Sequence, residues 1–152
     1  METLNDRLEK ASQSKENKDG MCSIRYRLGD LLHLENKSPI APETVLKELG
    51  RLNKVSSFSR TEIFSDSPSC ALELLDPYGL QNMNAPDVDM ITVFTCAIQA
   101  AYFLGSSSKV SFWIAGIRSV VFDRQSSIPA CNRREMAGLL KNDFKHVHLY
   151  DV

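Results

Sequence analysis

Fifteen consecutive residues without a charged side chain, Met90–Leu104 (MITVFTCAIQAAYFL), constrain the fold of this chain more than any other stretch. A helix needs about 20 apolar residues to cross a bilayer, and shorter runs are more typical of core helices. This run also contains Thr92, Thr95 and Gln99. We therefore expect a helix that is buried in protein, and no transmembrane segment.

The flanking residues predict where this helix begins and ends. Asn84 is a candidate N-cap, Pro86 suits the first turn, and Asp87 and Asp89 are favoured by the helix dipole. Gly105 provides a C-terminal stop. Because such a helix is apolar on every side, it has to be covered by sheet, by other helices or by a second subunit.

The residues after the helix predict a central strand over Lys109–Asp123 (KVSFWIAGIRSVVFD). The segment is rich in β-branched and aromatic residues, and both alternating faces are apolar. One face would carry Val110, Phe112 and Ile114, and the other Trp113, Ala115 and Ile117.

Periodicity elsewhere predicts further elements. The pattern of Cys22–Leu28 alternates strictly, which indicates a strand with one apolar and one solvated face, and Pro42 begins an amphipathic helix. The other expected elements are strands over 57–64 and 70–76, a helix from about Pro129, and a final strand within 145–152.

These elements run in the order β-α-β-β-α-β-α-β, which predicts an α+β fold. We expect a single domain over 21–152, with a mixed, mostly antiparallel sheet packed against the central apolar helix and two amphipathic helices. The polar residues 1–20 are expected to form a flexible arm. The total length of 152 residues is typical of one domain.

Cysteine usage suggests where the protein functions. Cys22, Cys70, Cys96 and Cys131 are widely spaced and form no C-x-x-C pair. The first 20 residues have no apolar run of the kind that a secretory signal needs. We therefore expect a reducing, intracellular environment, a cytoplasmic location and unpaired thiols.

The sequence contains no specific catalytic or metal-binding signature. His146 and His148 could share a strand face, but no recognised pattern adds Cys131 or Asp143 as further metal ligands. Cys131 lies beside Arg133 and Arg134, which would lower the pKa of its thiol, so it could act as a nucleophile together with one of these histidines and Asp143. No local sequence signature supports such a site.

Other common active-site patterns are also missing. No G-x-G-x-x-G or G-K-[ST] motif occurs, and the carboxylate pairs Asp87/Asp89 and Glu73/Asp76 are explained by helix and turn chemistry. The prediction is a non-enzymatic protein that has neither cofactor nor metal.

Charge is distributed unevenly along a chain whose net charge is -1. No Lys, Arg or His occurs from Thr61 to Ser108, whereas basic residues dominate from Lys109 to Arg134. The charges could interleave in space and cancel, or they could form two complementary surfaces. The predicted acidic surface consists of Glu62, Asp66, Glu73 and Asp76, and the predicted basic surface of Arg25, Arg27, Lys109, Arg118, Arg124, Arg133 and Arg134.

Complementary surfaces predict a structural protein that binds other proteins and associates with itself. Weak, salt-dependent contact of the basic surface with RNA or an acidic membrane is also expected. The combination of a polar arm, an all-apolar helix and a mixed sheet resembles small viral matrix-type structural proteins, which implies an alternative role bridging membrane and ribonucleoprotein. A monomeric adapter or regulator and, as the weakest alternative, a cysteine-dependent enzyme stay open.

Overall fold

The fold is a six-stranded sheet in which every pair of neighbouring strands is parallel, with strand order β3-β2-β1-β4-β5-β6. It is seen in a computed structural model that describes residues 6, 20–29, 31, 38–55, 58–76, 83–130 and 145–152. The strands are β1 (Met21–Arg25), β2 (Arg60–Phe64), β3 (Met83–Asn84), β4 (Tyr102–Leu104), β5 (Ser126–Pro129) and β6 (Val147–Tyr150).

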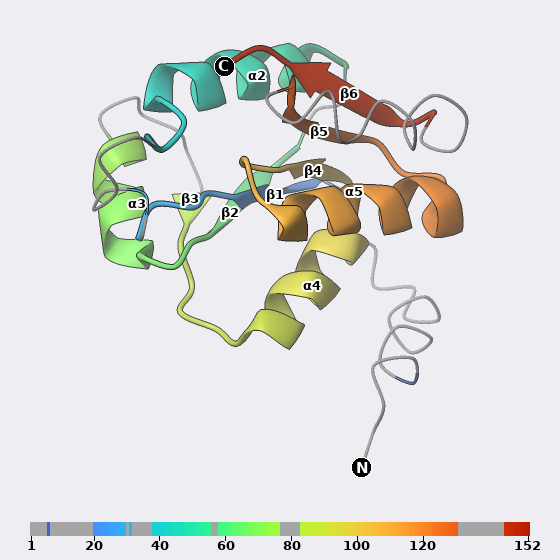
Figure 1. The fold of residues 1–152 in the computed structure, drawn as a ribbon, viewed down its shortest axis with the longest axis horizontal. Helices are drawn as coiled ribbons and strands as arrows, with labels where there is room; N and C mark the ends of the chain where they lie inside the picture. The colour runs from blue at the N-terminus through green and yellow to red at the C-terminus, as the bar shows by residue number, and fades with distance from the viewer. Residues whose placement is uncertain are drawn as a thin grey trace.

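Helices cover both faces of this sheet. They are α2 (Pro42–Val55), α3 (Pro68–Leu75), α4 (Met90–Gln99) and α5 (Lys109–Phe122). Figure 1 shows α2 on one side of the sheet and α4 and α5 on the other. The molecule is therefore a three-layer α/β domain.

The predicted α+β fold with a mostly antiparallel sheet is wrong. A helix lies between β1 and β2, between β2 and β3, between β3 and β4, and between β4 and β5. Such crossovers join parallel strands, whereas antiparallel neighbours can be joined by short hairpins. Two segments that we predicted to be strands, 70–76 and 109–123, lie mainly within α3 and α5, and this error changed the fold class.

Segment 109–123 begins as a helix at an N-cap, which its apolar pattern did not indicate. The Ser108 side chain accepts a hydrogen bond from the Ser111 backbone N–H at 3.1 Å, which begins α5. At the other end, Asp123 has a left-handed backbone conformation with φ 55°. The β-branched residues between these two positions lie within the helix.

The predicted central helix is confirmed in α4, but it is shorter than expected. It ends at Gln99, and Tyr102–Leu104 form β4 instead. Its N-cap is Asp89, whose side chain accepts from the Thr92 N–H at 2.8 Å, and not Asn84, which belongs to β3. The described structure does not cover this helix on every side, because Met90 and Ile91 are exposed.

Four further predicted elements are confirmed: β1, α2, β2 and β6. The predicted solvated face of β1 is wrong, since all five residues of the strand are buried. The expected helix from about Pro129 is replaced at its start by β5, and its remainder, 131–144, lies outside the described residues. Apart from Asp6 and Gly20, the predicted arm also lies outside them.

Two apolar clusters hold the layers together, one on each side of the sheet. On the α2 side, Val45, Leu49 and Leu52 pack with Ile24 and Leu104. On the α5 side, Ile114 and Ala115 pack with Phe103 and Ile128. Burial on both faces is typical of a parallel sheet and provides the main stabilisation.

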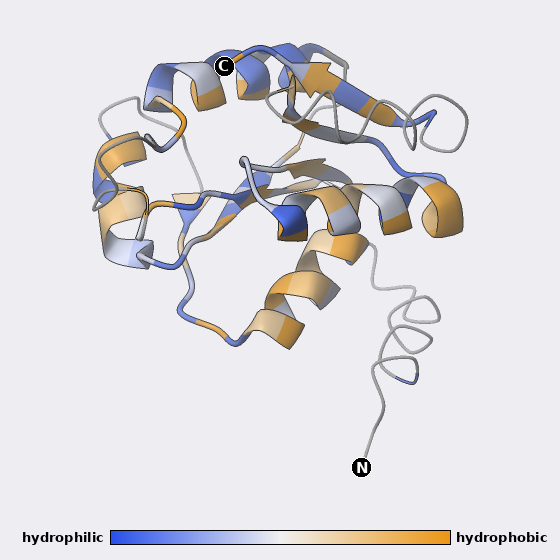
Figure 2. Cartoon of the chain, viewed as in Figure 1, coloured by the Kyte–Doolittle hydropathy of each residue, from blue (hydrophilic) through white to orange (hydrophobic). Residues whose placement is uncertain are grey.

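Apolar side chains remain exposed on the two helices of the second face. Figure 2 shows hydrophobic residues along the whole of α4 and in patches on α5. On α5, Trp113 is 62% exposed, and Val120 and Val121 are similarly exposed. Within the described residues, no helix combines the length and apolar character needed to span a membrane.

Candidate functional site

The carboxyl ends of β1 and β4 lie side by side at the centre of the sheet. The chain leaves β1 toward α2 on one face and leaves β4 toward α5 on the other (Figure 1). In open α/β sheets, the place where successive crossovers change faces leaves a crevice outside the carboxyl ends of the strands, and ligands bind there. The residues that follow β1 and β4 therefore form the first candidate site.

Arg25 ends β1 with its guanidinium mostly buried. Its Nη1 donates to the Phe64 carbonyl at 3.1 Å, while its Nε is buried and has no partner among the described residues. Burial lowers the pKa of Arg25, the charge of Asp66 opposes this effect, and Arg27 lowers the pKa further. The edge thus holds a cation with an unused donor.

The backbone just after β1 is fixed from the neighbouring strand. Asp66, which follows β2, accepts a hydrogen bond from the Leu28 N–H at 2.8 Å. A Cβ atom on Gly29 would lie 2.9 Å from the Asp66 carboxylate, so a larger residue would have to displace this carboxylate. Burial would raise the pKa of Asp66, but the backbone N–H groups of Leu28 and Gly29 lower it overall. Asp66 thereby positions the loop that carries Arg27.

The segment Gly105–Lys109 (GSSSK) follows β4 and leads into α5. The Gly105 N–H donates to the Ser127 carbonyl at 2.7 Å, and a Cβ atom at this glycine would lie 2.7 Å from the Ser111 Cβ. Ser106 is 4% exposed, yet its hydroxyl has no partner in the described part of the chain. Buried hydroxyl groups are normally hydrogen-bonded, so this one has unused hydrogen-bonding capacity.

Strand register brings the two segments together. Ile24 pairs with Leu104, so the residues that follow them, Arg25 and Gly105, lie at the same edge of the sheet. The N-cap of α5, Ser108, lies two residues beyond Ser106, and the dipole of this helix favours an anion near its N-terminus. Positive charge, a helix N-terminus and two unpartnered polar groups therefore converge on one edge.

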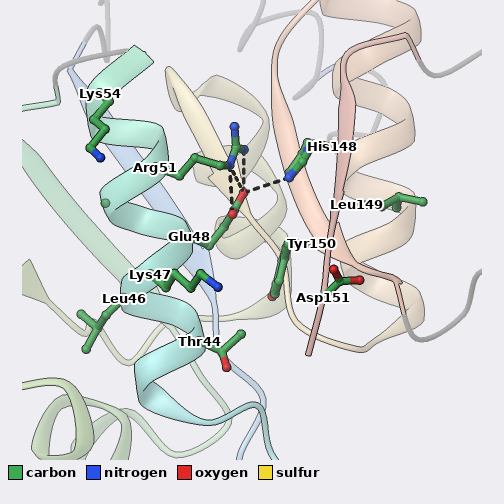
Figure 3. A pocket seen from close by; sticks show the side chains of 11 residues that line it. Thr44, Leu46, Lys47, Glu48, Arg51, Lys54, His148, Leu149, Tyr150 and Asp151 are labelled. Atoms are coloured by element: carbon green, nitrogen blue, oxygen red, sulfur yellow. Dashed lines mark hydrogen bonds and ion pairs between the residues drawn. The ribbon is translucent and has the colours of Figure 1, made fainter.

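A second candidate site is a groove between α2 and β6, with a volume of about 530 Å³. Figure 3 shows Glu48 and Arg51 of α2 reaching toward His148 of β6. The Glu48 Oε1 accepts from Arg51 Nη2 at 2.6 Å and from the Ser127 hydroxyl at 2.8 Å, and it lies 3.8 Å from the His148 ring nitrogen.

This cluster does not have the geometry of a serine nucleophile with a histidine base. Ser127 is fully buried and donates to the carboxylate of Glu48, whereas a nucleophile would donate to the histidine. Burial would raise the pKa of Glu48, but the hydrogen bonds from Arg51 and Ser127 and the nearby positive charges lower it. The cluster joins α2 to β5.

The structure disperses the predicted basic surface. Arg25 and Arg118 are buried and Arg124 is half-buried, whereas Arg27 is half-buried near the carboxyl edge and Lys109 is exposed at the start of α5. Arg133 and Arg134 lie outside the described residues. Among the described members of this predicted surface, Arg25, Arg27 and Lys109 belong to the segments at the carboxyl edge.

The four residues of the predicted acidic surface divide between two places. Glu62 lies in β2, 3.5 Å from Arg60, and Asp66 binds the loop after β1. Glu73 and Asp76 are exposed, within and just after α3. Their exposure is compatible with a surface that contacts a partner.

Arg118 lies in the core of the second face instead of on a surface. Its guanidinium donates to the carbonyls of Ala97, Ile98 and Ala100 at 2.6, 3.0 and 2.8 Å, and to Gln125 at 2.8 Å. Burial, followed by the charge of Arg124, lowers the pKa of Arg118 to about 9, so the group remains charged at neutral pH. It binds the carboxyl end of α4, where cations are favoured.

The described residues give little support to the metal site and the cysteine-nucleophile site that were considered from the sequence. No group of three or more metal-ligating side chains occurs in that part of the chain. His146 contacts Asp123 at 2.6 Å, while His148 faces Glu48. Cys22, Cys70 and Cys96 take part in no disulfide bond in the described structure, and burial raises the pKa of Cys22 to about 12. Cys131 and Asp143 lie outside the described residues.

The carboxyl-edge site was not predicted from the sequence. The run Gly105–Ser108 was the available signal, because glycine and serines between an apolar segment and a possible helix are typical of a strand–loop–helix junction. No signal in the sequence pairs Glu48 with Ser127. No family model matches the chain, and no curated protein matches it.

Proposed function

We propose that this protein binds a phosphate-bearing small molecule of the nucleotide class at the carboxyl edge, between the loops that follow β1 and β4. The observation that carries the proposal is the buried, unpartnered Ser106 hydroxyl beside the N-terminus of α5. Arg25, Arg27 and Lys109 supply positive charge at the same edge. Phosphate oxygens accept hydrogen bonds from such groups.

The strand order supports the class of ligand. The order β3-β2-β1-β4-β5-β6 is the one found in doubly wound domains that bind dinucleotides at the point between the first and fourth strands. This is an analogy of fold. The chain lacks the glycine-rich motif of those domains. The carboxylate of Asp66, which follows β2, already accepts a hydrogen bond from the Leu28 N–H in the loop after β1. The proposal therefore rests on the loop after β4.

Ser106→Ala tests this proposal with two opposite effects. Removal of a buried, unsatisfied hydroxyl should raise the free energy of unfolding of the ligand-free protein, by about 1 kcal/mol. Ligand binding should weaken about tenfold or more, because one hydrogen bond to a charged acceptor is lost. Calorimetric titration with ADP, GDP, UDP, CDP and inorganic pyrophosphate measures binding, and urea unfolding measures stability.

Ser107→Ala is the matched control, since Ser107 lies in the same loop and is half-buried. It should change neither quantity appreciably. The proposal fails if none of the five probes binds at millimolar concentration, or if Ser106→Ala binds them as tightly as the wild type.

We also propose, as predicted from the sequence, that the chain associates with itself or with another protein. The exposed Trp113, Val120 and Val121 favour a protein partner, since apolar patches of this kind often mark interaction surfaces. A cytoplasmic location is proposed from the free thiols. Contact with RNA or acidic membranes, the matrix-type role, the adapter role and the absence of enzymatic activity remain predictions.

A further inference from the structure

β6 lies at one end of the sheet and pairs only with β5 among the described strands. The Ser126 N–H donates to the His146 carbonyl at 3.0 Å, and Ser127 is in register with His148. Alternate residues of a parallel strand direct their backbone groups to the same neighbour. The N–H and C=O groups of Val147 and Leu149 therefore point outward, away from β5.

The groove described above runs along this strand. Its lining includes His148, Leu149, Tyr150 and Asp151, which extend from alternate sides of the strand. Figure 3 shows the side chains of α2 forming the opposite wall. An exposed strand edge is a template for pairing with another chain, and the groove leaves room for the side chains of an added strand.

We infer that β6 pairs antiparallel with β6 of a second copy of this chain, across a two-fold axis. Val147 would lie opposite Leu149 of the second copy, and each such pair exchanges two backbone hydrogen bonds. The two-fold axis generates a second, equivalent pair, so all the outward-pointing N–H and C=O groups of Val147 and Leu149 are hydrogen-bonded. Both sheets would then join into one continuous sheet.

Charge complementarity favours a second copy in this orientation. In the same register, Lys145 lies opposite Asp151 of the second copy at both ends of the pairing. Both residues are exposed. Opposite charges that face each other across antiparallel strands are stabilising, whereas a parallel, in-register arrangement would set like charges beside each other. The isologous interface is therefore complementary to itself.

Leu149→Pro tests the pairing of the backbones. The Leu149 N–H points outward, so proline removes a hydrogen bond to the second copy without removing one to β5. Sedimentation velocity over a range of concentrations should show the wild type moving from monomer to dimer. Leu149→Pro should remain monomeric, with its circular dichroism unchanged.

A charge-reversal series tests the register and does not depend on the tolerance for proline. Lys145→Glu should weaken the dimer about tenfold or more, because two acids would face each other at both ends. The double variant Lys145→Glu/Asp151→Lys should restore it. Since Lys145 also lies 3.1 Å from Asp123 within the chain, Asp123→Asn is the control and should leave the dimer intact.

Rescue by the double variant would support the proposed register. A wild type that stays monomeric at the highest concentration would overturn the inference. A dimer that persists in Leu149→Pro and in Lys145→Glu would overturn it too, and would point to the exposed apolar side chains of α5. Nucleotide binding at the carboxyl edge is measured separately, so either proposal can fail alone.

Discussion

At the scale of single residues, Arg118 shows how one buried charge can organise several segments. Its guanidinium binds the last carbonyls of α4, the Gln125 carbonyl and the Ser126 hydroxyl at 2.9 Å. This arginine was assigned to a basic surface from the sequence because of its charge, although most of its neighbours in the chain are apolar. The partners that make burial possible come from folding, which brings the end of α4 to the side of α5.

Arg118→Met should be among the most destabilising substitutions in the described part of the chain. Methionine fills similar space but leaves several buried carbonyls without donors, so we expect a loss of about 3–5 kcal/mol in the free energy of unfolding. Lys109→Met, at an exposed position of the same helix, should cost less than about 0.5 kcal/mol. Urea unfolding compares the two, and equal stabilities would contradict the assigned role.

Glu48 makes stability depend on pH. Its folded-state pKa lies below its ordinary value of 4.5. The stability that it contributes is therefore fully present above this value and is lost as pH falls through the folded-state pKa. The difference in the free energy of unfolding between wild type and Glu48→Gln should be constant near neutral pH and should shrink below about pH 4.5. A difference that grows on acidification would contradict this sign.

At the scale of elements, α5 depends on its first turn. The helix contains many β-branched residues, which have modest helix propensity, so its cap matters. An apolar segment of this length can be a strand or a buried helix by periodicity alone. The signal that distinguishes the two is the serine run that precedes the segment, because Ser108 caps the helix. This signal involves fewer residues than the apolar pattern from which a strand was predicted.

Ser108→Ala should lower the free energy of unfolding by about 1 kcal/mol, because the helix loses its N-cap. Ser107→Ala, one residue earlier, should have little effect, since no cap bond involves its side chain in the described structure. Thermal unfolding followed by circular dichroism distinguishes the two variants. A Ser107 variant as unstable as the Ser108 variant would argue against the cap.

At the scale of the whole molecule, five elements were predicted from the sequence, namely β1, α2, β2, α4 and β6, but their arrangement was not. β1 alternates apolar residues with Ser23 and Arg25, which suggested an antiparallel strand with a wet face. The structure buries both polar residues. The direction of neighbouring strands depends on the segments that connect them. Because two helices, α3 and α5, were predicted as strands, a parallel sheet was predicted as mostly antiparallel.

The candidate site was equally hidden from the sequence, because its parts are distant along the chain. Arg25 and Ser106 are brought to the same edge by the pairing of β1 with β4. A motif search needs neighbouring residues, whereas this edge collects single residues from separate loops. The chemistry of each residue was readable, but their proximity depends on strand order.

The central position of β1 also affects how the chain can fold while it is being synthesised. Its first neighbour, β2, follows soon after, but its second neighbour, β4, begins only at Tyr102. A ribosome that has released β1 and β2 still has to translate through α4 before the other edge of β1 can be covered. The nascent chain therefore carries an open strand edge for much of its elongation, and this interval is when a chaperone would be most useful.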